Sequence, residues 1–280
     1  MDAPDPPAPR ATSWDPGQYL RHAGPRARPL HDLLARVPAL PHAHPRIADL
    51  GCGPGGPTTV PAARWPTARI TGYDNSPAML EAARDHAGPT PGGGTLDFAH
   101  ADLTDWRPDG PYDLILSNAA LQWVPGHTAS FPAWTESLHP GGVFAFQVPG
   151  NFTAPSHLLL REQVHSPRWR ARLGDVLRNE EPVQAPADYL GLLTSLGCAA
   201  DVWETTYLHL LAGPDPVLDW TKGTALRPVL TRLADDPEAR DAFLAEYRGR
   251  LRAAYPPGPH GTVFPFRRIF AVAQKLPAPS

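Results

Sequence analysis

The stretch that decides the fold reads Ile47-Ala48-Asp49-Leu50-Gly51-Cys52-Gly53-Pro54-Gly55. A short apolar run ends in a carboxylate, and three glycines then follow at every second position. This order is typical of a strand that turns into a helix, because glycine serves where the backbone takes a positive φ or touches a ligand. The helix is expected to open near Pro57 and Thr58. We therefore expect a ligand-binding loop after the first strand of an α/β sheet.

The carboxylate of Asp49 indicates which kind of ligand this loop binds. Read loosely, Gly51-x-Gly53-x-x-Gly56 also satisfies a dinucleotide fingerprint, so the glycines alone do not discriminate. A carboxylate directly before the glycines would repel a pyrophosphate, whereas it would attract the amino group of a methionine moiety beside a sulfonium. The residues therefore favour S-adenosylmethionine over NAD or FAD, and a nicotinamide dehydrogenase remains an alternative.

Composition narrows the classes of partner. The 280 residues suffice for one large α/β core with an insertion. A net charge of -3 without a Lys/Arg run gives no general attraction to nucleic acid. Cys52 and Cys198 are too few for a disulfide framework, and neither a signal peptide nor a membrane span is indicated. We expect a cytoplasmic protein that acts on a small molecule, without nucleic-acid or membrane partners; the oligomeric state stays open.

Apolar runs bounded by turn residues alternate with helical stretches through most of the chain. Such alternation predicts βαβ units and a doubly wound, mostly parallel sheet of seven strands, a Rossmann-like α/β fold. The expected strands are Arg46–Cys52, Arg69–Asp74, Thr95–Ala101, Tyr112–Asn118, Gly142–Val148, Ala200–Leu211 and Thr262–Gln274. The expected helices include Ser76–His86, Phe131–Leu138, Ala187–Leu196, Pro216–Lys222, Arg227–Leu233 and Pro237–Ala254.

Three segments outside this alternation are expected to form a helical cap, at 13–40, 150–185 and 212–260. A connection of about fifty residues between two strands of one domain is usually functional. Open α/β sheets bind ligands outside the carboxyl ends of their strands, so we expect the cap at that edge. Residues 1–12 are rich in proline and are expected to form a disordered tail before a single domain at 13–280.

Acidic residues also close the second and third strands. Asp74 is well placed to accept hydrogen bonds from both ribose hydroxyls, a device that NAD enzymes share. Asp102 could accept a hydrogen bond from an adenine amino group, or it could simply cap the turn after its strand. Asn75, Met79 and Leu103 stand next to these acids in the sequence and could flank the adenine and ribose.

The glycine turn, Asp74, Asp102 and Tyr112–Asn118 resemble, in order and spacing, the class I S-adenosylmethionine-dependent methyltransferases. Within that superfamily the chain is most similar to the trans-aconitate methyltransferases, from about residue 13 to residue 274. The similar segments are Trp14-Asp15-Pro16, Tyr19-Leu20, Arg28-Pro29, Ala48–Gly55, Arg69–Gly72, Ser76–Met79, Asn118-Ala119, Leu121-Gln122-Trp123, His127, Phe131-Pro132, Leu226-Arg227-Pro228 and Arg268. Ala120, Gly126 and the proline-rich ends depart from that pattern.

The resemblance implies a methyltransferase that esterifies a small polycarboxylic acid, trans-aconitate, and releases S-adenosylhomocysteine. It implies cofactor contacts by Tyr19 and Asn118 in addition to Asp49, Gly51, Gly53, Gly55, Asp74, Asn75, Met79, Asp102 and Leu103. An O- or C-methyltransferase of another small metabolite remains an alternative, as does a protein that binds S-adenosylmethionine without transferring its methyl group.

The residues after the fourth strand favour an oxygen acceptor. Asn118-Ala119-Ala120-Leu121 lacks the Asn/Asp-Pro-Pro-Tyr/Phe motif that grips an amine. A carboxylate is already ionised at neutral pH and needs no general base, so no catalytic residue is expected. Gln122, Trp123 and His127 are candidates for positioning. His127 would serve as a base only for a phenol or alcohol acceptor.

The unreactive charges of a polycarboxylate would be costly to bury unpaired. Arginine is their natural partner, because its planar fork binds a carboxylate bidentately and stays charged. The candidates are Arg28, Arg227 and Arg268, with Tyr207 and His209 as neutral contributors.

A metal site is not expected. His42-Ala43-His44 has the spacing of a ligand pair, but it lies in a proline-bounded loop and no third ligand stands nearby in the sequence.

Overall fold

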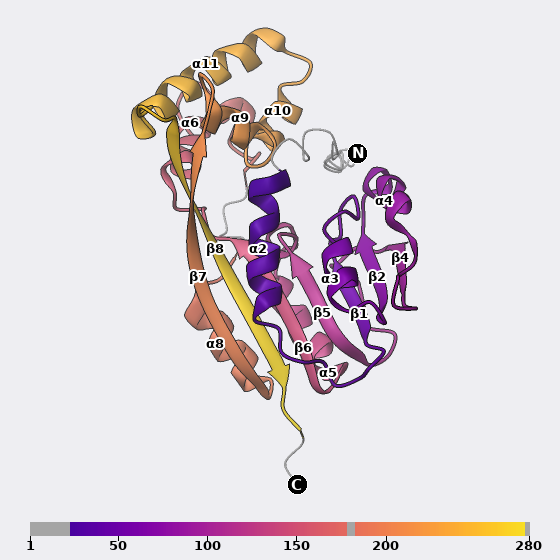
Figure 1. Cartoon of the computed structure of the whole chain (residues 1–280). Coiled ribbons are helices and arrows are strands. Elements are labelled where there is room, and N and C mark those ends of the chain that lie inside the picture. The colour runs from indigo at the N-terminus through magenta and orange to yellow at the C-terminus, as the bar shows by residue number, and fades with distance from the viewer. Residues whose placement is uncertain (1–22, 178–182, 278–280) are drawn as a thin grey trace, which may run out of the picture.

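In the computed structural model, which describes residues 23–177 and 183–277, eight strands form one sheet in the order β3-β4-β2-β1-β5-β6-β8-β7 (Figure 1). The strands are β1 (Arg46–Leu50), β2 (Arg69–Asp74), β3 (Gly88–Pro89), β4 (Thr95–His100), β5 (Tyr112–Asn118), β6 (Leu138–Pro149), β7 (Cys198–Leu211) and β8 (Thr262–Lys275). Strands β4, β2, β1, β5 and β6 run parallel, whereas β8 is antiparallel to both its neighbours and β3 is antiparallel to β4.

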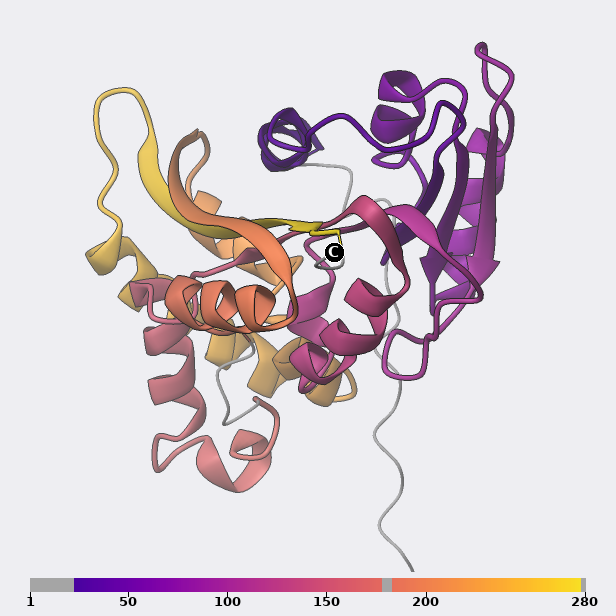
Figure 2. The same cartoon turned by 90° about the horizontal axis from the view of Figure 1, so that it is seen from below.

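Helices cover both faces of the sheet (Figure 2). Helices α2 and α3 lie on one face, and α5 and α8 lie on the other. The helices are α2 (Ala23–Ala35), α3 (Thr59–Arg64), α4 (Pro77–Ala83), α5 (Phe131–Glu136), α6 (Pro155–Val164), α7 (Arg170–Leu173), α8 (Pro186–Ser195), α9 (Pro216–Lys222), α10 (Arg227–Arg232) and α11 (Pro237–Ala254). Short 3₁₀ turns are η1 (Arg84–His86), η2 (Leu121–Trp123) and η3 (His127–Ser130). The predicted fold class, a mostly parallel α/β sheet covered on both faces, is confirmed.

The predicted number of strands was wrong, because residues 23–177 and 183–277 form eight strands rather than seven. The extra strand, β3, has only two residues, Gly88 and Pro89, and pairs with β4 at the edge of the sheet. Glycine and proline are depleted in strands, so nothing in this dipeptide signals one. The pairing follows from the tight turn at Gly92–Gly94, which the Thr90 N–H closes by donating to the Gly94 carbonyl at 3.0 Å.

The central strand β5 explains how the two faces of the sheet are filled. It is buried on both sides, as expected of a parallel strand between helices. Successive side chains point to opposite faces, so Leu114 and Leu116 pack in the core under α2 and α3, while Ile115 packs in the core under α5 and α8. The polar residue Asn118 ends the strand at the carboxyl edge of the sheet.

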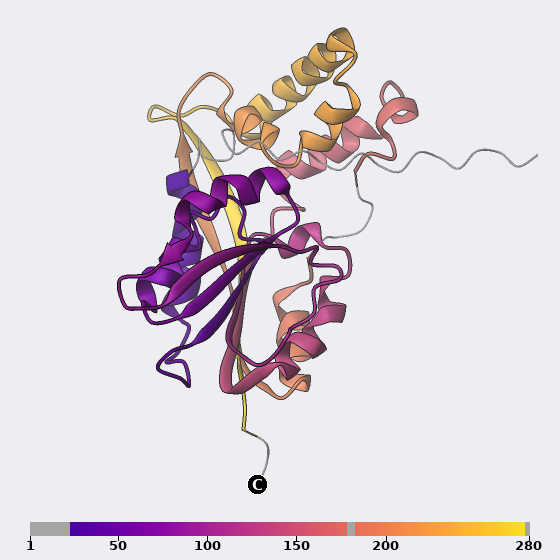
Figure 3. The ribbon, with the colours of Figure 1, turned by 90° about the vertical axis from the view of Figure 1, so that its right-hand side faces the viewer.

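A group of helices gathers beyond that carboxyl edge, as Figures 1 and 3 show. These helices, α6, α7, α9, α10 and α11, are called the helical layer below. They share an apolar cluster of their own, which includes Trp220, Phe243 and Tyr247 and, near the start of β8, Phe264. The layer therefore has an apolar core of its own beside the two on the faces of the sheet, and the long β7–β8 pair joins it to the sheet.

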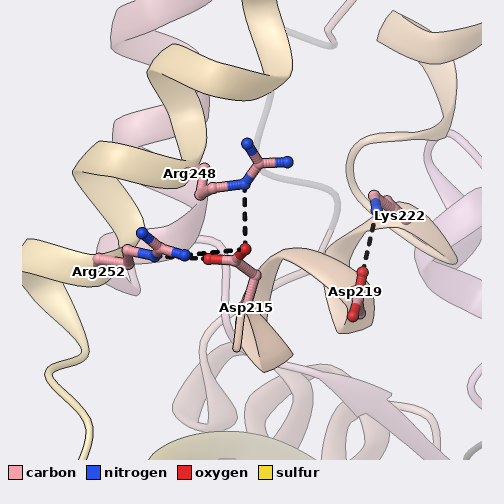
Figure 4. Close-up of polar contacts among 5 residues, drawn as sticks. All are labelled: Asp215, Asp219, Lys222, Arg248 and Arg252. Carbon is pink, nitrogen blue, oxygen red and sulfur yellow. Dashed lines mark hydrogen bonds and ion pairs between the residues drawn. The ribbon is translucent and has the colours of Figure 1, made fainter. Parts of the chain in front are cut away.

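Ion pairs also hold the helical layer together (Figure 4). Asp215, directly before α9, lies 3.1 Å from the Arg248 Nε and 2.7 Å from the Arg252 Nε, both on α11. A second pair, Asp219 with Lys222 at 3.0 Å, stays within α9. Asp215 thus connects two helices, whereas Asp219 connects none.

The expected cap segments occupy two different places. The described parts of 150–185 and 212–260 build much of the helical layer, whereas α2, from segment 13–40, packs along the sheet face through Leu30, Leu33 and Leu34. The cap role itself stays a prediction. The tail at 1–12 lies outside the described residues. Within the described ranges, no helix has both the length and the apolar character needed to cross a bilayer.

Candidate active site

The loop between β1 and α3 is shaped by its glycines. Gly51 and Gly53 have φ values of 78° and 56°, which side-chain-bearing residues rarely adopt. A Cβ on Gly51 would lie 2.1 Å from the Ala120 Cβ, so the protein itself requires glycine there. A Cβ on Gly53 would meet no atom within 4 Å. The backbone at Gly53 therefore faces open space in which a ligand can approach it.

Asp74 at the end of β2 turns its carboxylate toward this loop. It accepts hydrogen bonds from the backbone N–H of Gly53 at 3.0 Å and of Ser76 at 2.9 Å. Burial raises the pKa of Asp74, and these N–H donors counteract part of that rise. The carboxylate is thus held in a fixed orientation at the mouth of the glycine loop.

Asp49 is a buried carboxylate behind the same loop. Its side chain accepts a hydrogen bond from the Thr58 hydroxyl at 2.7 Å, and the residue is 3% exposed. Burial raises the pKa of Asp49 to about 6, and the negative charge of Asp74 adds to the rise. Two partly or fully buried carboxylates favour a nearby cation, which would neutralise their negative charges.

Asp102 lies in the turn after β4. Its Oδ1 accepts from the backbone N–H and the hydroxyl of Thr104, at 2.9 and 2.8 Å, and these bonds lower its pKa. Its Oδ2 accepts from the Asn75 side chain at 3.3 Å. Asp102 therefore caps its turn, which is one of the two roles that the sequence allows. It also lies beside Asn75, and the next residue, Leu103, lies near Gly51 of the glycine loop.

A row of polar side chains crosses the sheet from the end of β5. The Asn118 Oδ1 accepts a hydrogen bond from the Gln147 Nε2 at 2.7 Å, and the Gln147 Oε1 accepts from Arg268 at 3.2 Å. These three residues lie on β5, β6 and β8, and we call them the polar row. Gln147 was not predicted from the sequence, although a single polar residue within the apolar run Val143–Val148 was a usable signal.

Arg268 places a charge in a protected position. The residue is 6% exposed, and its guanidinium lies 4.6 Å from the centre of the Phe266 ring. Tyr207 pairs with Phe266 across β7 and β8, and the charge of Arg268 acts on the Tyr207 hydroxyl. The structure therefore places Arg268 and Tyr207 close together.

Arg28 and His209 join this group from two sides. The Arg28 guanidinium lies 5.1 Å from the Tyr207 ring centre and 3.7 Å from Asp32, to which the Tyr207 hydroxyl donates at 2.6 Å. The His209 ring stacks on Trp220 of α9, with centroids 4.9 Å apart. This cluster thus links α2, the β7–β8 pair and the helical layer.

His127 is placed in the apolar core rather than in the polar row. Its Nε2 lies 2.8 Å from the Tyr189 hydroxyl and its Nδ1 lies 3.3 Å from the Val124 carbonyl. Burial lowers its pKa, so the ring is neutral at pH 7. This geometry ties η3 to α8 and does not suit a general base.

The remaining predicted residues lie near the end of β5 or in the helical layer. Gln122 is buried, and its side-chain nitrogen donates to the Ala119 carbonyl at 2.5 Å, while Trp123 is exposed. Ala119 has a φ of 57°, a strained value for a residue other than glycine and one that often marks functional turns. Arg227 begins α10. Tyr19 lies outside the described residues.

Comparisons with known proteins identify the fold and the family of this chain. Residues 47–142 match the family model of a methyltransferase domain. The structure resembles that of the YcgJ protein of Bacillus subtilis, with a TM-score of 0.55 at 12% identity over 90% of this chain and 99% of the other. It also resembles phosphoethanolamine N-methyltransferase 2 of Haemonchus contortus, with a TM-score of 0.52 at 16% identity over 89% and 53%. Both likenesses show the fold.

Curated relatives are much closer in sequence. The chain is 66% identical over 265 residues to the trans-aconitate 2-methyltransferase of Streptomyces coelicolor, covering 95% of this chain and 88% of the relative. It is 68% identical over 264 residues to that of Streptomyces avermitilis, covering 94% and 97%. The chain therefore belongs to the trans-aconitate 2-methyltransferase family of S-adenosylmethionine-dependent methyltransferases.

Proposed function

We propose that this chain transfers the methyl group of S-adenosylmethionine to a carboxylate of trans-aconitate, giving the monomethyl ester and S-adenosylhomocysteine. The observation that carries the proposal is the polar row, which leads from Asn118, near the glycine loop, to the buried guanidinium of Arg268. Carboxylates that favour a cation and a guanidinium that favours an anion thus lie along one edge of one sheet. The names of the curated relatives support the same substrate.

The residues at the glycine loop fit the cofactor. Asp49 is assigned to its amino group, Asp74 to its ribose hydroxyls, and Asp102 with Asn75 to its adenine. The open space at Gly53 supports this assignment, because a ligand can reach the backbone there. The remaining contacts are assigned to Gly51, Gly55, Met79, Leu103 and Asn118.

The arginines are assigned to the acid. Arg268 is proposed to bind one unreactive carboxylate, because a guanidinium in a protected site binds an anion more strongly than one in water. Arg28 and Tyr207 are proposed to bind a second carboxylate. The Tyr207 hydroxyl, which donates to Asp32 in this structure, would then donate to the substrate instead. His209 and Arg227 are assigned to the side of the pocket formed by the helical layer.

The residues act by positioning rather than by proton transfer. S-adenosylmethionine, when bound, supplies a methyl group on a positively charged sulfur. The acceptor carboxylate is ionised at pH 7, so the chain has no proton to remove, and His127 is committed to the core. Holding the acceptor oxygen in line with the methyl carbon is the main contribution, since alignment supplies up to about 7–11 kcal/mol in favourable cases.

We also infer a cytoplasmic location. Both cysteines are buried free thiols, and burial raises the pKa of each. Such thiols suit a reducing compartment, because they neither pair nor form the reactive thiolate.

The decisive test is transfer of labelled methyl to a panel of di- and tricarboxylates, with the ester position mapped by NMR. We expect trans-aconitate to be the preferred acceptor.

The variant Arg268→Met should raise KM for the acid at least about tenfold with little change in cofactor affinity, as expected for a lost charged hydrogen bond. The matched control is Arg36→Met, since Arg36 also lies over an aromatic ring, that of Trp203, but is exposed. An equal effect of both variants would refute the role of Arg268.

A further inference from the structure

Two histidines and a carboxylate meet at the edge of the sheet opposite the glycine loop. His42 lies in the segment between α2 and β1, Asp113 is the second residue of β5 and His139 is the second residue of β6. One potential ligand atom of each lies within 4.8 Å of those of the other two. Asp113 and His139 stand where their strands begin, so the cluster is remote from the residues assigned to the cofactor and the acid.

Asp113 has the surroundings of a metal-binding carboxylate. It is buried, and its Oδ2 accepts a hydrogen bond from the Arg46 backbone N–H at 2.7 Å. Its Oδ1 faces the His42 Nδ1 at 2.6 Å. The Arg46 guanidinium is directed elsewhere, to Asp109 at 2.6 Å and over the Tyr112 ring at 4.3 Å. One carboxylate oxygen is thus fixed by the backbone, as is usual for metal ligands, and the other is presented to the histidines.

The spacing of the three side chains suits a small divalent cation. Ligand atoms around a tetrahedral zinc ion stand about 3.3 Å apart, given bonds of about 2.0–2.1 Å. The distances here bracket that value, with 2.6 Å between His42 and Asp113 and at most 4.8 Å within the cluster. The His42 and His139 rings already contact each other edge to face, with centroids 4.5 Å apart. His42 is 54% exposed at its side chain, so small rotations and a water ligand are both available.

We propose that His42, Asp113 and His139 bind one Zn²⁺ or similar divalent transition-metal ion. Imidazole nitrogens and a carboxylate are ligands that zinc accepts, and solvent at the exposed side supplies the fourth position. The ion replaces the hydrogen bond between His42 and Asp113 and ties the segment before β1 to β5 and β6. This differs from the His42–His44 pair considered from the sequence, because the further ligands come from distant strands and His44 is not among them.

The test uses tag-free, chelator-stripped full-length protein titrated with Co²⁺, whose visible spectrum reports imidazole coordination. We expect one Co²⁺ per chain, displaced by Zn²⁺. Saturating Zn²⁺, at about 100 times its dissociation constant, should raise Tm by roughly 5–10 °C. His42→Ala and His139→Ala should each lose the cobalt band and the shift in Tm. His44→Ala, two positions along the same loop, should keep both.

Binding of S-adenosylhomocysteine by every variant serves as the folding control, since none of the three ligands is assigned to that site. The proposal is overturned if the wild type takes up no stoichiometric Co²⁺, or if His139→Ala retains the band. It is equally overturned if His44→Ala loses the band as fully as His42→Ala does. Each of these results leaves the proposed methyl transfer untouched.

Discussion

At the scale of single residues, Asp49 makes the folded protein less stable than it could be. Burial raises the pKa of its carboxyl from 3.8 to about 6, so the charged form is disfavoured in the fold. Above pH 6 this corresponds to a deficit on the order of 2–3 kcal/mol in the free energy of unfolding. The only hydrogen bond described for the carboxylate is that from Thr58. A charge kept at such a cost is best explained by a cationic ligand.

Replacing Asp49 by asparagine should therefore stabilise the ligand-free protein and weaken ligand binding. The amide keeps an oxygen for the Thr58 hydroxyl and removes the buried charge. A carboxyl with a raised folded pKa destabilises fully above that value and not at all below the unfolded value. The gain in Tm should thus be largest above about pH 6 and shrink toward pH 4. Tm scans across this range check the sign, and a gain that grows with acidity would contradict it.

Replacing Asp74 should affect the cofactor without affecting the acid. Asp74→Asn keeps the side-chain shape but lacks the charge that ribose hydroxyls are proposed to bind, so we expect about 1.5–3 kcal/mol less binding energy for S-adenosylhomocysteine. Calorimetric titration measures this loss. The control is Asp97→Asn, an exposed acid on the neighbouring β4. Equal affinity in Asp74→Asn and the wild type would remove Asp74 from the site.

At the scale of elements, the local sequence pattern predicted the first and last residues of some helices and strands correctly. The bounds of β2, β5, α9 and α11 agree with the sequence, because apolar runs and proline at the first helical turn mark them. The two-residue strand β3 has neither an apolar run nor a helix-starting proline to mark its bounds.

The polar row could be predicted from the sequence only in part. Asn118 and Arg268 were each predicted as site residues, but their link through Gln147 depends on the pairing of β6 with β8. That pairing joins residues more than a hundred positions apart, and no local signal reports it.

The ion pairs of the helical layer allow a matched comparison. Asp215 is only 17% exposed at its side chain and contacts two arginines of α11, whereas Asp219 is 59% exposed and pairs within its own helix. Asp215→Asn should cost about 1–2 kcal/mol and increase amide exchange in α9 and α11, since a partly protected pair exceeds the surface value. Asp219→Asn should cost less than about 0.5 kcal/mol. Equal exchange in both variants would mean that Asp215 does not join the helices.

At the scale of the whole molecule, the fold separates two kinds of charge along one edge of the sheet. The carboxylates of Asp49 and Asp74 stand at the glycine loop, and the guanidinium groups of Arg268 and Arg28 stand on the side of β7 and β8. The neutral amides of Asn118 and Gln147 lie between them. A cationic donor and an anionic acceptor would therefore be drawn to adjacent places, with the helical layer beyond the same edge.

This arrangement predicts how the rate depends on pH. No group must lose a proton for the acceptor to react, so kcat/KM for the cofactor should not rise between about pH 7 and pH 9. It should fall below about pH 6, because Asp49 then takes up a proton and loses its attraction for the ammonium group. Asp49→Asn should lower kcat/KM for the cofactor near pH 7 and remove the fall near pH 6. Only the fall caused by protonation of the substrate, at lower pH, should remain. A rate that climbs steadily above pH 7 would instead require a titrating base and would contradict a carboxylate acceptor.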